Sequence, residues 1–155
     1  MISMKVLYVC NKGGHYSQML SLKDLMSKDN SVVISDKKGA DADFGDCAEC
    51  YYMPAFNYKK HKIWYLIKNF FQALAIILKF QPDYIVTTGA GIAVPVFVAG
   101  KLTFKRLIYI ETRARVYSKS STGRMLSKIV DKVIVQWPEM VDVYGGKAEY
   151  FGTII

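Results

Sequence analysis

Cysteine is scarce in this chain of 155 residues, which has only Cys10, Cys47 and Cys50. An odd number of cysteines without a secretory signal fits a reducing compartment. Cys47 and Cys50 have the C-x-x-C spacing of half a zinc site or of a redox pair. The sequence offers no second pair and no nearby histidine for the remaining ligands. We therefore expect these thiols to be structural, and we expect no metal and no cofactor.

Several signatures of nucleotide-binding and membrane-spanning proteins are also missing. The loop after the first apolar run has neither the G-x-G-x-x-G pattern of dinucleotide-binding folds nor the Gly-Lys-Ser/Thr of a Walker A loop. No segment has the uninterrupted apolar length of a spanning helix. The chain has no arginine-rich run and no recognisable nucleic-acid motif, so we do not expect a nucleic-acid partner.

What the chain does have is a high apolar content and an excess of positive charge. Apolar residues make up 52% and aromatic residues 14% of the sequence, which predicts a single domain over residues 1–155 with a real core. The formal net charge of +8 suggests an anionic partner, such as anionic lipid or a phosphate-bearing substrate. Charge alone does not choose among anions, and it also serves solubility.

Short apolar runs alternate with helical patterns along the chain. We expect strands at residues 6–10, 31–35, 50–53, 84–88, 107–110, 132–136 and 149–151. We expect helices at 15–26, 59–80, 92–102 and 121–130, and a turn or short helix at 138–144. Right-handed crossovers place such strands in parallel. The pattern therefore predicts an α/β fold, a doubly wound parallel sheet with helices on both faces.

Ligands of open parallel sheets bind beyond the carboxyl ends of the strands, and three loops at such ends stand out. The first is Asn11-Lys12-Gly13-Gly14-His15. Its glycines let backbone N–H groups approach a ligand closely, and the helix that follows favours an anion. His15 is the candidate general base or anion ligand. A plain chain reversal with a helix-capping histidine would produce the same sequence.

The other two loops follow the strands at 84–88 and 107–110. Small residues and a hydroxyl in the first suit a close approach to phosphate or sugar; they are Thr88, Gly89 and Gly91. A carboxylate and two guanidiniums in the second form a plausible anion and sugar site; they belong to Glu111, Arg113 and Arg115. A tight turn and a solvated charged loop explain either loop alone. Their convergence on one edge of the sheet favours a shared site.

The segment at residues 59–80 is too apolar for an ordinary surface helix. It begins with a basic cluster and continues with large aromatic side chains; they are Lys59, Lys60, Lys62, Trp64, Phe70 and Phe71. Such a pattern suits a helix lying in an anionic membrane surface. A core helix packed on the sheet is the other interpretation. We expect a mixture, with one stripe on the sheet and the rest on lipid.

Four motifs in register resemble one known family. They are Gly13-Gly14-His15 with Gln18-Met19, the 87–91 loop with Pro95, Glu111-Thr112-Arg113 with Arg115-Val116, and Val135-Gln136-Trp137-Pro138. The order resembles the acceptor-side subunit of the two-part, Alg-type N-acetylglucosaminyltransferase of dolichol-linked oligosaccharide assembly. The likeness is closer to the bacterial counterparts in capsular and exopolysaccharide biosynthesis, and it covers nearly the whole chain.

The resemblance implies a fold and a division of labour. The fold would be the N-terminal, Rossmann-like half of a GT-B glycosyltransferase. The subunit would attach peripherally to the cytoplasmic face of the cell membrane and bind a polyprenyl-diphosphate-linked sugar. A separate catalytic, donor-binding subunit would complete an inverting transfer of a hexose from a UDP-sugar. The last strand and the tail after it are the expected contact with that partner.

The family is also similar to the fused N-acetylglucosaminyltransferase of peptidoglycan lipid intermediates. In that enzyme a glycine-rich loop with a histidine lies near the acceptor diphosphate. By this likeness the diphosphate would lie on Gly13, Gly14 and His15, with help from the 89–91 loop. Glu111 and Arg113 would face the acceptor, which makes Glu111 the rival of His15 as general base.

Two other functions remain open from the sequence. A standalone nucleotide-binding α/β enzyme would hold a nucleotide site within this chain alone. A non-catalytic membrane scaffold would recruit a transferase without touching substrate. The scaffold would tolerate charge changes at Glu111 and Arg113 but not changes at Trp64 and Phe71.

Overall fold

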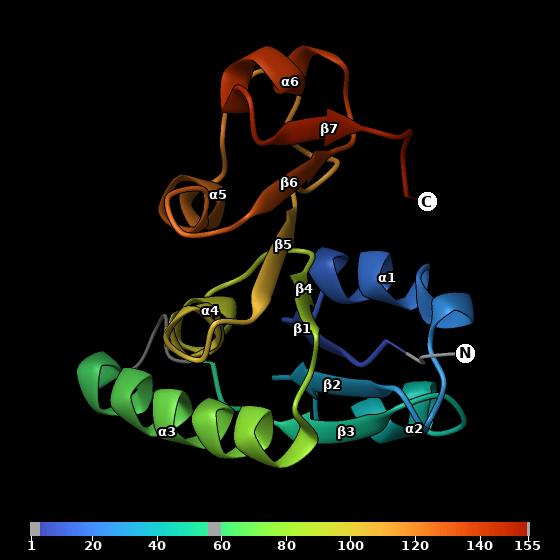
Figure 1. The fold of residues 1–155 in the computed structure, drawn as a ribbon, viewed down its shortest axis with the longest axis vertical. Helices are drawn as coiled ribbons and strands as arrows, with labels where there is room; N and C mark the ends of the chain where they lie inside the picture. Colours follow the sequence, from blue (N-terminus) through green and yellow to red (C-terminus); the bar gives the residue numbers. More distant parts are fainter. Residues whose placement is uncertain (1–3, 56–59, 155) are drawn as a thin grey trace.

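The computed structural model describes residues 4–55 and 60–154, which form a seven-stranded sheet with helices on both faces (Figure 1). The strands are β1 (Val6–Cys10), β2 (Ser31–Ser35), β3 (Glu49–Tyr52), β4 (Tyr84–Thr87), β5 (Arg106–Ile110), β6 (Lys132–Val135) and β7 (Ala148–Tyr150). The helices are α1 (Gly14–Leu20), α2 (Ala40–Phe44), α3 (Lys62–Phe80), α4 (Ala93–Leu102), α5 (Ser121–Leu126) and α6 (Glu139–Tyr144), with a 3₁₀ turn η1 (Lys23–Leu25) after α1.

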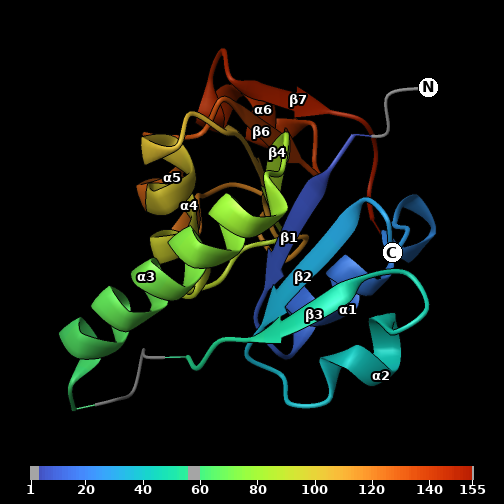
Figure 2. The same ribbon diagram turned by 60° about the horizontal axis from the view of Figure 1, so that its bottom comes forward.

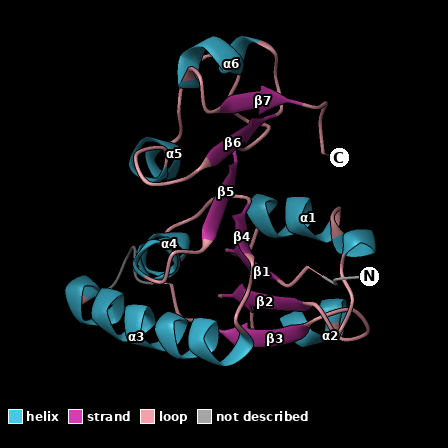
Figure 3. Cartoon of the chain, viewed as in Figure 1, coloured by secondary structure: helices cyan, strands magenta, loops and turns pink. Residues whose placement is uncertain are grey.

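The strands run in parallel in the order β3-β2-β1-β4-β5-β6-β7 (Figure 3). The chain builds outward from β1 to one edge and from β4 to the other. The junction of β1 and β4 is therefore the switch point of a doubly wound sheet. This confirms the predicted fold class. Folds of this kind bind ligands beyond the carboxyl ends of the two strands at the switch point.

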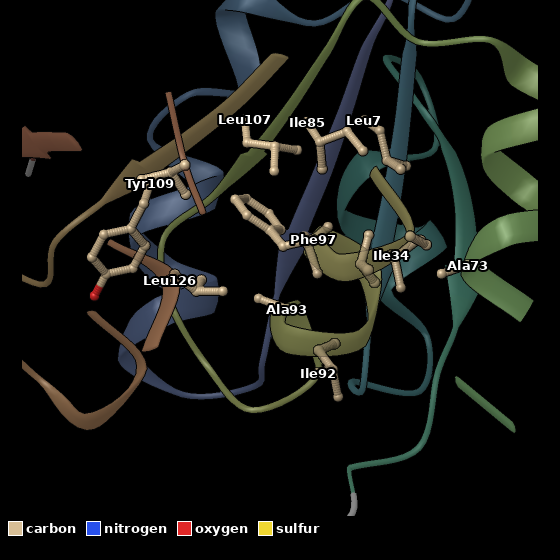
Figure 4. Packing of buried hydrophobic residues seen from close by; sticks show 14 of the residues in the cluster. Leu7, Ile34, Ala73, Ile85, Ile92, Ala93, Phe97, Leu107, Tyr109 and Leu126 are labelled. Atoms are coloured by element: carbon tan, nitrogen blue, oxygen red, sulfur yellow. The ribbon is translucent and has the colours of Figure 1, made fainter. Parts of the chain in front are cut away.

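The larger core lies between the sheet and the layer formed by α3, α4, α5 and α6. Leu7, Ile34, Ile85 and Leu107 project from the strands toward Phe97 of α4 (Figure 4). All five side chains are fully buried. Burial of each contributes about 1.5–3 kcal/mol relative to exposure. This layer fixes the position of α4, whose N-terminus follows the 87–91 loop.

The opposite face of the sheet is covered less completely. α1 and α2 lie on this face (Figure 2). They pack through Tyr16 and Phe44, whose rings meet edge to face with centroids 5.4 Å apart. Farther along the same face, apolar side chains of β4, β5, β6 and the C-terminal segment line a cavity of about 400 Å³; they include Val86, Ile108, Ile134, Phe151 and Ile154. Leu22 and Leu25, at the 3₁₀ turn after α1, also line this cavity, whereas no residue of the described α-helices does.

The first helix is shorter than predicted. α1 ends at Leu20 and η1 follows, whereas the sequence pattern indicated one helix reaching Met26. The N–H of Leu22 bonds to the carbonyl of Met19, three residues back, at 3.0 Å. This tighter spacing is typical of a 3₁₀ turn at a helix end. It lets the chain reverse toward β2 while Met26 still reaches the core.

Candidate functional site

The three loops expected to carry chemistry lie side by side at one edge of the sheet. They follow β1, β4 and β5, which are consecutive strands of the parallel sheet. The carboxyl ends of consecutive parallel strands share one edge, so the loops necessarily converge there. The following contacts describe how each loop is held.

The first and second loops are joined by a reciprocal pair of hydrogen bonds. Nδ1 of His15 lies 2.7 Å from the carbonyl oxygen of Thr88, and the Thr88 hydroxyl donates to the carbonyl of His15 at 2.8 Å. A carbonyl oxygen can only accept, so Nδ1 is the protonated nitrogen of the ring. In the neutral imidazole, Nε2 is then left as the acceptor. His15 is half-buried, with a fixed ring orientation and a nitrogen suited to take a proton.

The imidazole of His15 packs closely against Gly89, which explains why a glycine occupies this position of the second loop. Gly89 has a φ of 106°, and a Cβ at this position would lie 2.9 Å from Cε1 of His15. Ala90 beside it has a φ of 117°, which is unfavourable for a residue with a side chain. Gly13 also has a positive φ, 89°. Strained backbone of this kind is concentrated at ligand sites, and its position here supports a functional loop.

A carboxylate that the sequence analysis missed fixes the first loop. Asp36, directly after β2, is buried and accepts hydrogen bonds from the N–H of Lys12 and from Nδ2 of Asn11. Oδ1 of Asn11 in turn accepts the N–H of Ile92 at 3.4 Å. The loop is thereby tied both to β2 and to the start of α4. The available signal was an acidic residue at the end of a buried strand.

Glu111 lies below the rim of the site. It is only 1% exposed, and four donors surround its carboxylate. Oε1 accepts from the hydroxyl of Tyr109 at 2.7 Å and from the N–H of Thr112 at 2.8 Å. Oε2 accepts from the N–H of Ser120 at 3.0 Å and from the hydroxyl of Tyr144. These contacts support a positioning role for Glu111 over the predicted role as a base facing the acceptor.

The two tyrosines remain donors at physiological pH. Burial raises the pKa of Tyr109 well above its usual range, and the nearby Glu111 carboxylate raises it further. Burial and the hydrogen bond to Glu111 raise the pKa of Tyr144 in the same way. Glu111 therefore ties the end of β5 to α5 and α6 and holds the loop between them.

The loop that Glu111 holds presents two exposed guanidiniums. Arg113 is anchored through its backbone, because Nε1 of Trp137 donates to its carbonyl at 2.7 Å. The N–H of Arg115 bonds to the carbonyl of Thr112 at 3.0 Å. Within residues 4–55 and 60–154, no carboxylate pairs with either guanidinium. Both remain available for an anion.

Gln136, at the end of β6, is a second residue whose role the sequence analysis did not identify. Its buried Nε2 donates to the carbonyl of Glu111 at 2.9 Å and to Oε1 of Gln18 on α1 at 3.1 Å. Its Oε1 accepts the N–H of Ile154 at 2.9 Å. One side chain therefore links the third loop, α1 and the C-terminal segment.

The exposed face of α3 carries the large apolar side chains expected to meet lipid. Trp64 is 65% and Phe71 62% exposed, whereas Phe70 is half-buried and Ala73 is buried against the core. The predicted division into one stripe on the protein and one outside is thus present in the helix. Lys60 and Lys62 are exposed at its beginning, and Lys59 lies outside the described residues.

The length of α3 also bears on whether it crosses a membrane. In the part of the chain that the structure describes, α3 is long and apolar enough to cross a membrane by length and composition. Its apolar residues are nevertheless interrupted by Lys68, Asn69 and Gln72, so the prediction that no uninterrupted apolar run spans a membrane stays a prediction. Core helices pass the same test, and Asn69 and Ala73 of α3 are indeed buried in the protein.

The thiols show no sign of reactivity. Burial raises the pKa of Cys10 to about 12 and that of Cys50 to about 11, so both stay protonated at neutral pH. Cys47 is buried as well. No group of three or more metal-ligating side chains gathers among the described residues.

Comparison with known proteins gives matches in sequence and in fold. The sequence model of the family described as Oligosaccharide biosynthesis protein Alg14 like matches residues 57–154. The human UDP-N-acetylglucosamine transferase subunit ALG14 is 26% identical over 182 residues, with 99% of this chain and 84% of that protein covered. The mouse protein of that name is 35% identical, but the match covers only 52% of this chain and 39% of the relative.

Two further similarities are more limited: one sequence match covers a shorter segment, and one solved structure shares the fold at low sequence identity. The UDP-N-acetylglucosamine–N-acetylmuramyl-(pentapeptide) pyrophosphoryl-undecaprenol N-acetylglucosamine transferase of Chlorobaculum tepidum is 31% identical over 86 residues, covering 56% of this chain and 23% of the enzyme. The crystal structure of Acinetobacter baumannii MurG superimposes with a TM-score of 0.77 at 16% identity, covering 98% of this chain and 46% of that one. The fold is that of the N-terminal, Rossmann-like half of a GT-B glycosyltransferase.

Proposed function

The chain belongs to the Alg14-like family of oligosaccharide biosynthesis proteins, and from this premise we propose that it is the acceptor-binding, membrane-attaching subunit of a split glycosyltransferase. The proposed reaction is the transfer of a hexose from a UDP-sugar to a polyprenyl-diphosphate-linked sugar, in capsular or exopolysaccharide biosynthesis or in lipid-linked oligosaccharide assembly. The printed names of the relatives, a UDP-N-acetylglucosamine transferase subunit and a transferase acting on a pyrophosphoryl-undecaprenol acceptor, support this assignment.

The observation that carries the proposal is the fixed imidazole of His15 beside two glycine loops. The acceptor hydroxyl attacks the anomeric carbon of the donor, and the bond from that carbon to the UDP oxygen breaks. UDP leaves with the electron pair, and Nε2 of His15 takes the proton of the attacking hydroxyl. The Nδ1 contact with Thr88 orients the ring for this step. A positioned general base contributes about 10²–10⁴-fold to such a reaction.

The acceptor diphosphate is proposed to lie between the three loops. Backbone N–H groups of Gly13, Gly14 and the 89–91 loop approach from one side. The guanidiniums of Arg113 and Arg115 approach from the other side. Both types of donor are well suited to phosphate oxygens. Glu111, Asp36 and Gln136 are assigned to positioning, because their polar atoms are already used within the protein.

Attachment to the membrane is assigned to α3 and partner binding to the opposite face of the sheet. Trp64 and Phe71 give α3 an apolar surface, and Lys60 and Lys62 at its start favour anionic lipid by about 1 kcal/mol each. The cavity lined by Ile108 and its neighbours suits the catalytic, donor-binding subunit, because apolar surface of this kind gains by burial against protein.

Reconstitution tests the proposed division of labour. The chain should be purified alone and together with its donor-binding partner, and each preparation should receive a UDP-sugar and a short-chain polyprenyl-diphosphate sugar. Transfer only by the complex supports the proposal. Transfer by the chain alone would instead support a self-contained nucleotide-binding enzyme. If complex activity survived charge reversal at both Arg113 and Arg115, a non-catalytic scaffold would be the better description.

A further inference from the structure

An apolar groove lies between α3 and α4. Its volume is about 290 Å³, and its lining is entirely apolar. Phe70 and Phe71 form the α3 side, and Val94, Pro95 and Val98 form the α4 side. Complete ligand pockets begin at about this size, so the groove fits a short segment of a larger apolar molecule.

The groove begins where the proposed diphosphate site ends. The N–H of Val94 bonds to the carbonyl of Gly91 at 3.2 Å, so the first α4 residue of the lining is one turn from the 89–91 loop. An acceptor held by its diphosphate at that loop would have its lipid chain beside Val94. The proposed anion site and the apolar groove are adjacent. A ligand in which a diphosphate is joined directly to a hydrocarbon chain could therefore occupy both.

The remaining exposed surface of α3 lies outside this groove. Ile63 and Trp64 are 68% and 65% exposed, and neither lines it. The helix therefore offers two apolar surfaces, one that forms a groove with α4 and one outside it. The outer surface suits a bilayer, whereas a groove with walls from two helices suits a single chain.

We propose that the groove between α3 and α4 binds the first isoprene units of the lipid-linked acceptor and so selects polyprenyl diphosphates by their chain. This inference rests on the proposed acceptor function and adds a second subsite to it. Each methylene group removed from water raises affinity about fourfold. Binding of one or two branched units should therefore raise affinity for the diphosphate by at least about tenfold.

Titration of the full chain in solution, without vesicles, tests the subsite. The probes are inorganic diphosphate, isopentenyl diphosphate, geranyl diphosphate, farnesyl diphosphate and farnesol, each below its aggregation threshold. The expected result is an affinity that rises by at least about tenfold from inorganic diphosphate to geranyl diphosphate and then levels off. Phe71→Ser should remove most of this gain and leave inorganic diphosphate binding unchanged.

Trp64→Ser is the matched control, because Trp64 lies on the same helix with nearly the same exposure as Phe71, yet outside the groove. It should keep the gain with chain length and lose binding to anionic vesicles. If Phe71→Ser weakens only vesicle binding, the groove faces the bilayer and the proposal fails.

The titration separates failure of the subsite from failure of the proposed function. Binding of all diphosphates with equal affinity would overturn the subsite and leave the acceptor site standing. Binding of farnesol equal to that of farnesyl diphosphate, with no binding of inorganic diphosphate, would overturn the acceptor site and keep an apolar chain site. Absence of binding by every probe would overturn both.

Discussion

His15 and Glu111 hold equivalent places in the sequence and opposite places in the structure. Each is a polar residue just beyond the end of a parallel strand, and each is a plausible base. His15 uses Nδ1 to orient its ring, and no hydrogen bond from a described residue occupies Nε2. Glu111 is buried and both of its oxygens are occupied by donors. The difference teaches that a side chain with all its acceptor atoms already hydrogen-bonded within the protein serves to position others, whereas one with a free acceptor can react. Residue type alone does not separate the two roles.

The largest expected effect is on catalysis by the complex. His15→Ala should lower kcat by about 10²–10⁴-fold, because no other side chain is assigned to take the proton. The melting temperature should change little, since His15 is half-buried and makes one side-chain hydrogen bond. Steady-state kinetics of the complex and thermal unfolding of the chain measure the two quantities. Full activity in this variant would remove His15 from the mechanism.

At Glu111, by contrast, we expect the main effect of substitution to be on stability. Glu111→Ala leaves four donors without their acceptor, and because each unsatisfied buried donor costs about 1–3 kcal/mol, the free energy of unfolding should fall by at least about 3 kcal/mol. Glu111→Gln keeps one acceptor oxygen and should cost about 1–3 kcal/mol. Denaturant unfolding measures both values. A stable Glu111→Gln protein whose complex has lost activity, together with the acidic limb of the pH–rate profile, would identify Glu111 as the base.

Asp36 offers an intermediate test of positioning. Asp36→Asn can accept one of the two hydrogen bonds that hold the first loop, so the loss of stability should be about 1–2 kcal/mol. Affinity for inorganic diphosphate should fall, because the N–H groups of Gly13 and Gly14 lose their fixed direction. Calorimetry compares this variant with Asp43→Asn, whose carboxylate bonds to Tyr16 on the α1 side of the sheet. Equal diphosphate affinities in the two variants would exclude a role of Asp36 in the loop.

The last comparison is between two neighbouring backbone positions, and it includes the smallest expected effect. Gly89→Ala should lower stability by about 1–3 kcal/mol and displace the imidazole of His15, because φ is positive there and the new methyl group meets the ring. Ala90→Gly should change stability by less than about 1 kcal/mol, since relief of strain offsets the greater freedom of the unfolded chain. Equal losses in the two variants would show that contact with His15 does not matter at Gly89.

The fold was predictable because its signals are local. The alternation of apolar runs with helical patterns indicated every strand, and the crossover rule then put the three loops on one edge. The end of α1 at Leu20 was missed because the hydrogen bond from the N–H of Leu22 to the carbonyl of Met19, which tightens the chain there, leaves no trace in the apolar periodicity.

The positioning residues were not predictable, since their partners are distant in the sequence. Glu111 meets Tyr144, 33 positions away, and Gln136 meets Gln18, 118 positions away. Only the folded chain brings such groups together. Asp36 shows the intermediate case, because an acid at a strand end is visible in the sequence but its donors, Lys12 and Asn11, are not.

Calorimetric titration of the isolated chain tests the central claim most directly. One titration uses a short-chain polyprenyl-diphosphate sugar, and the other uses a panel of UDP-sugars. The account predicts binding of the lipid diphosphate and no tight binding of any UDP-sugar in the absence of a partner. Tight binding of a UDP-sugar by the chain alone, without binding of the lipid diphosphate, would contradict it.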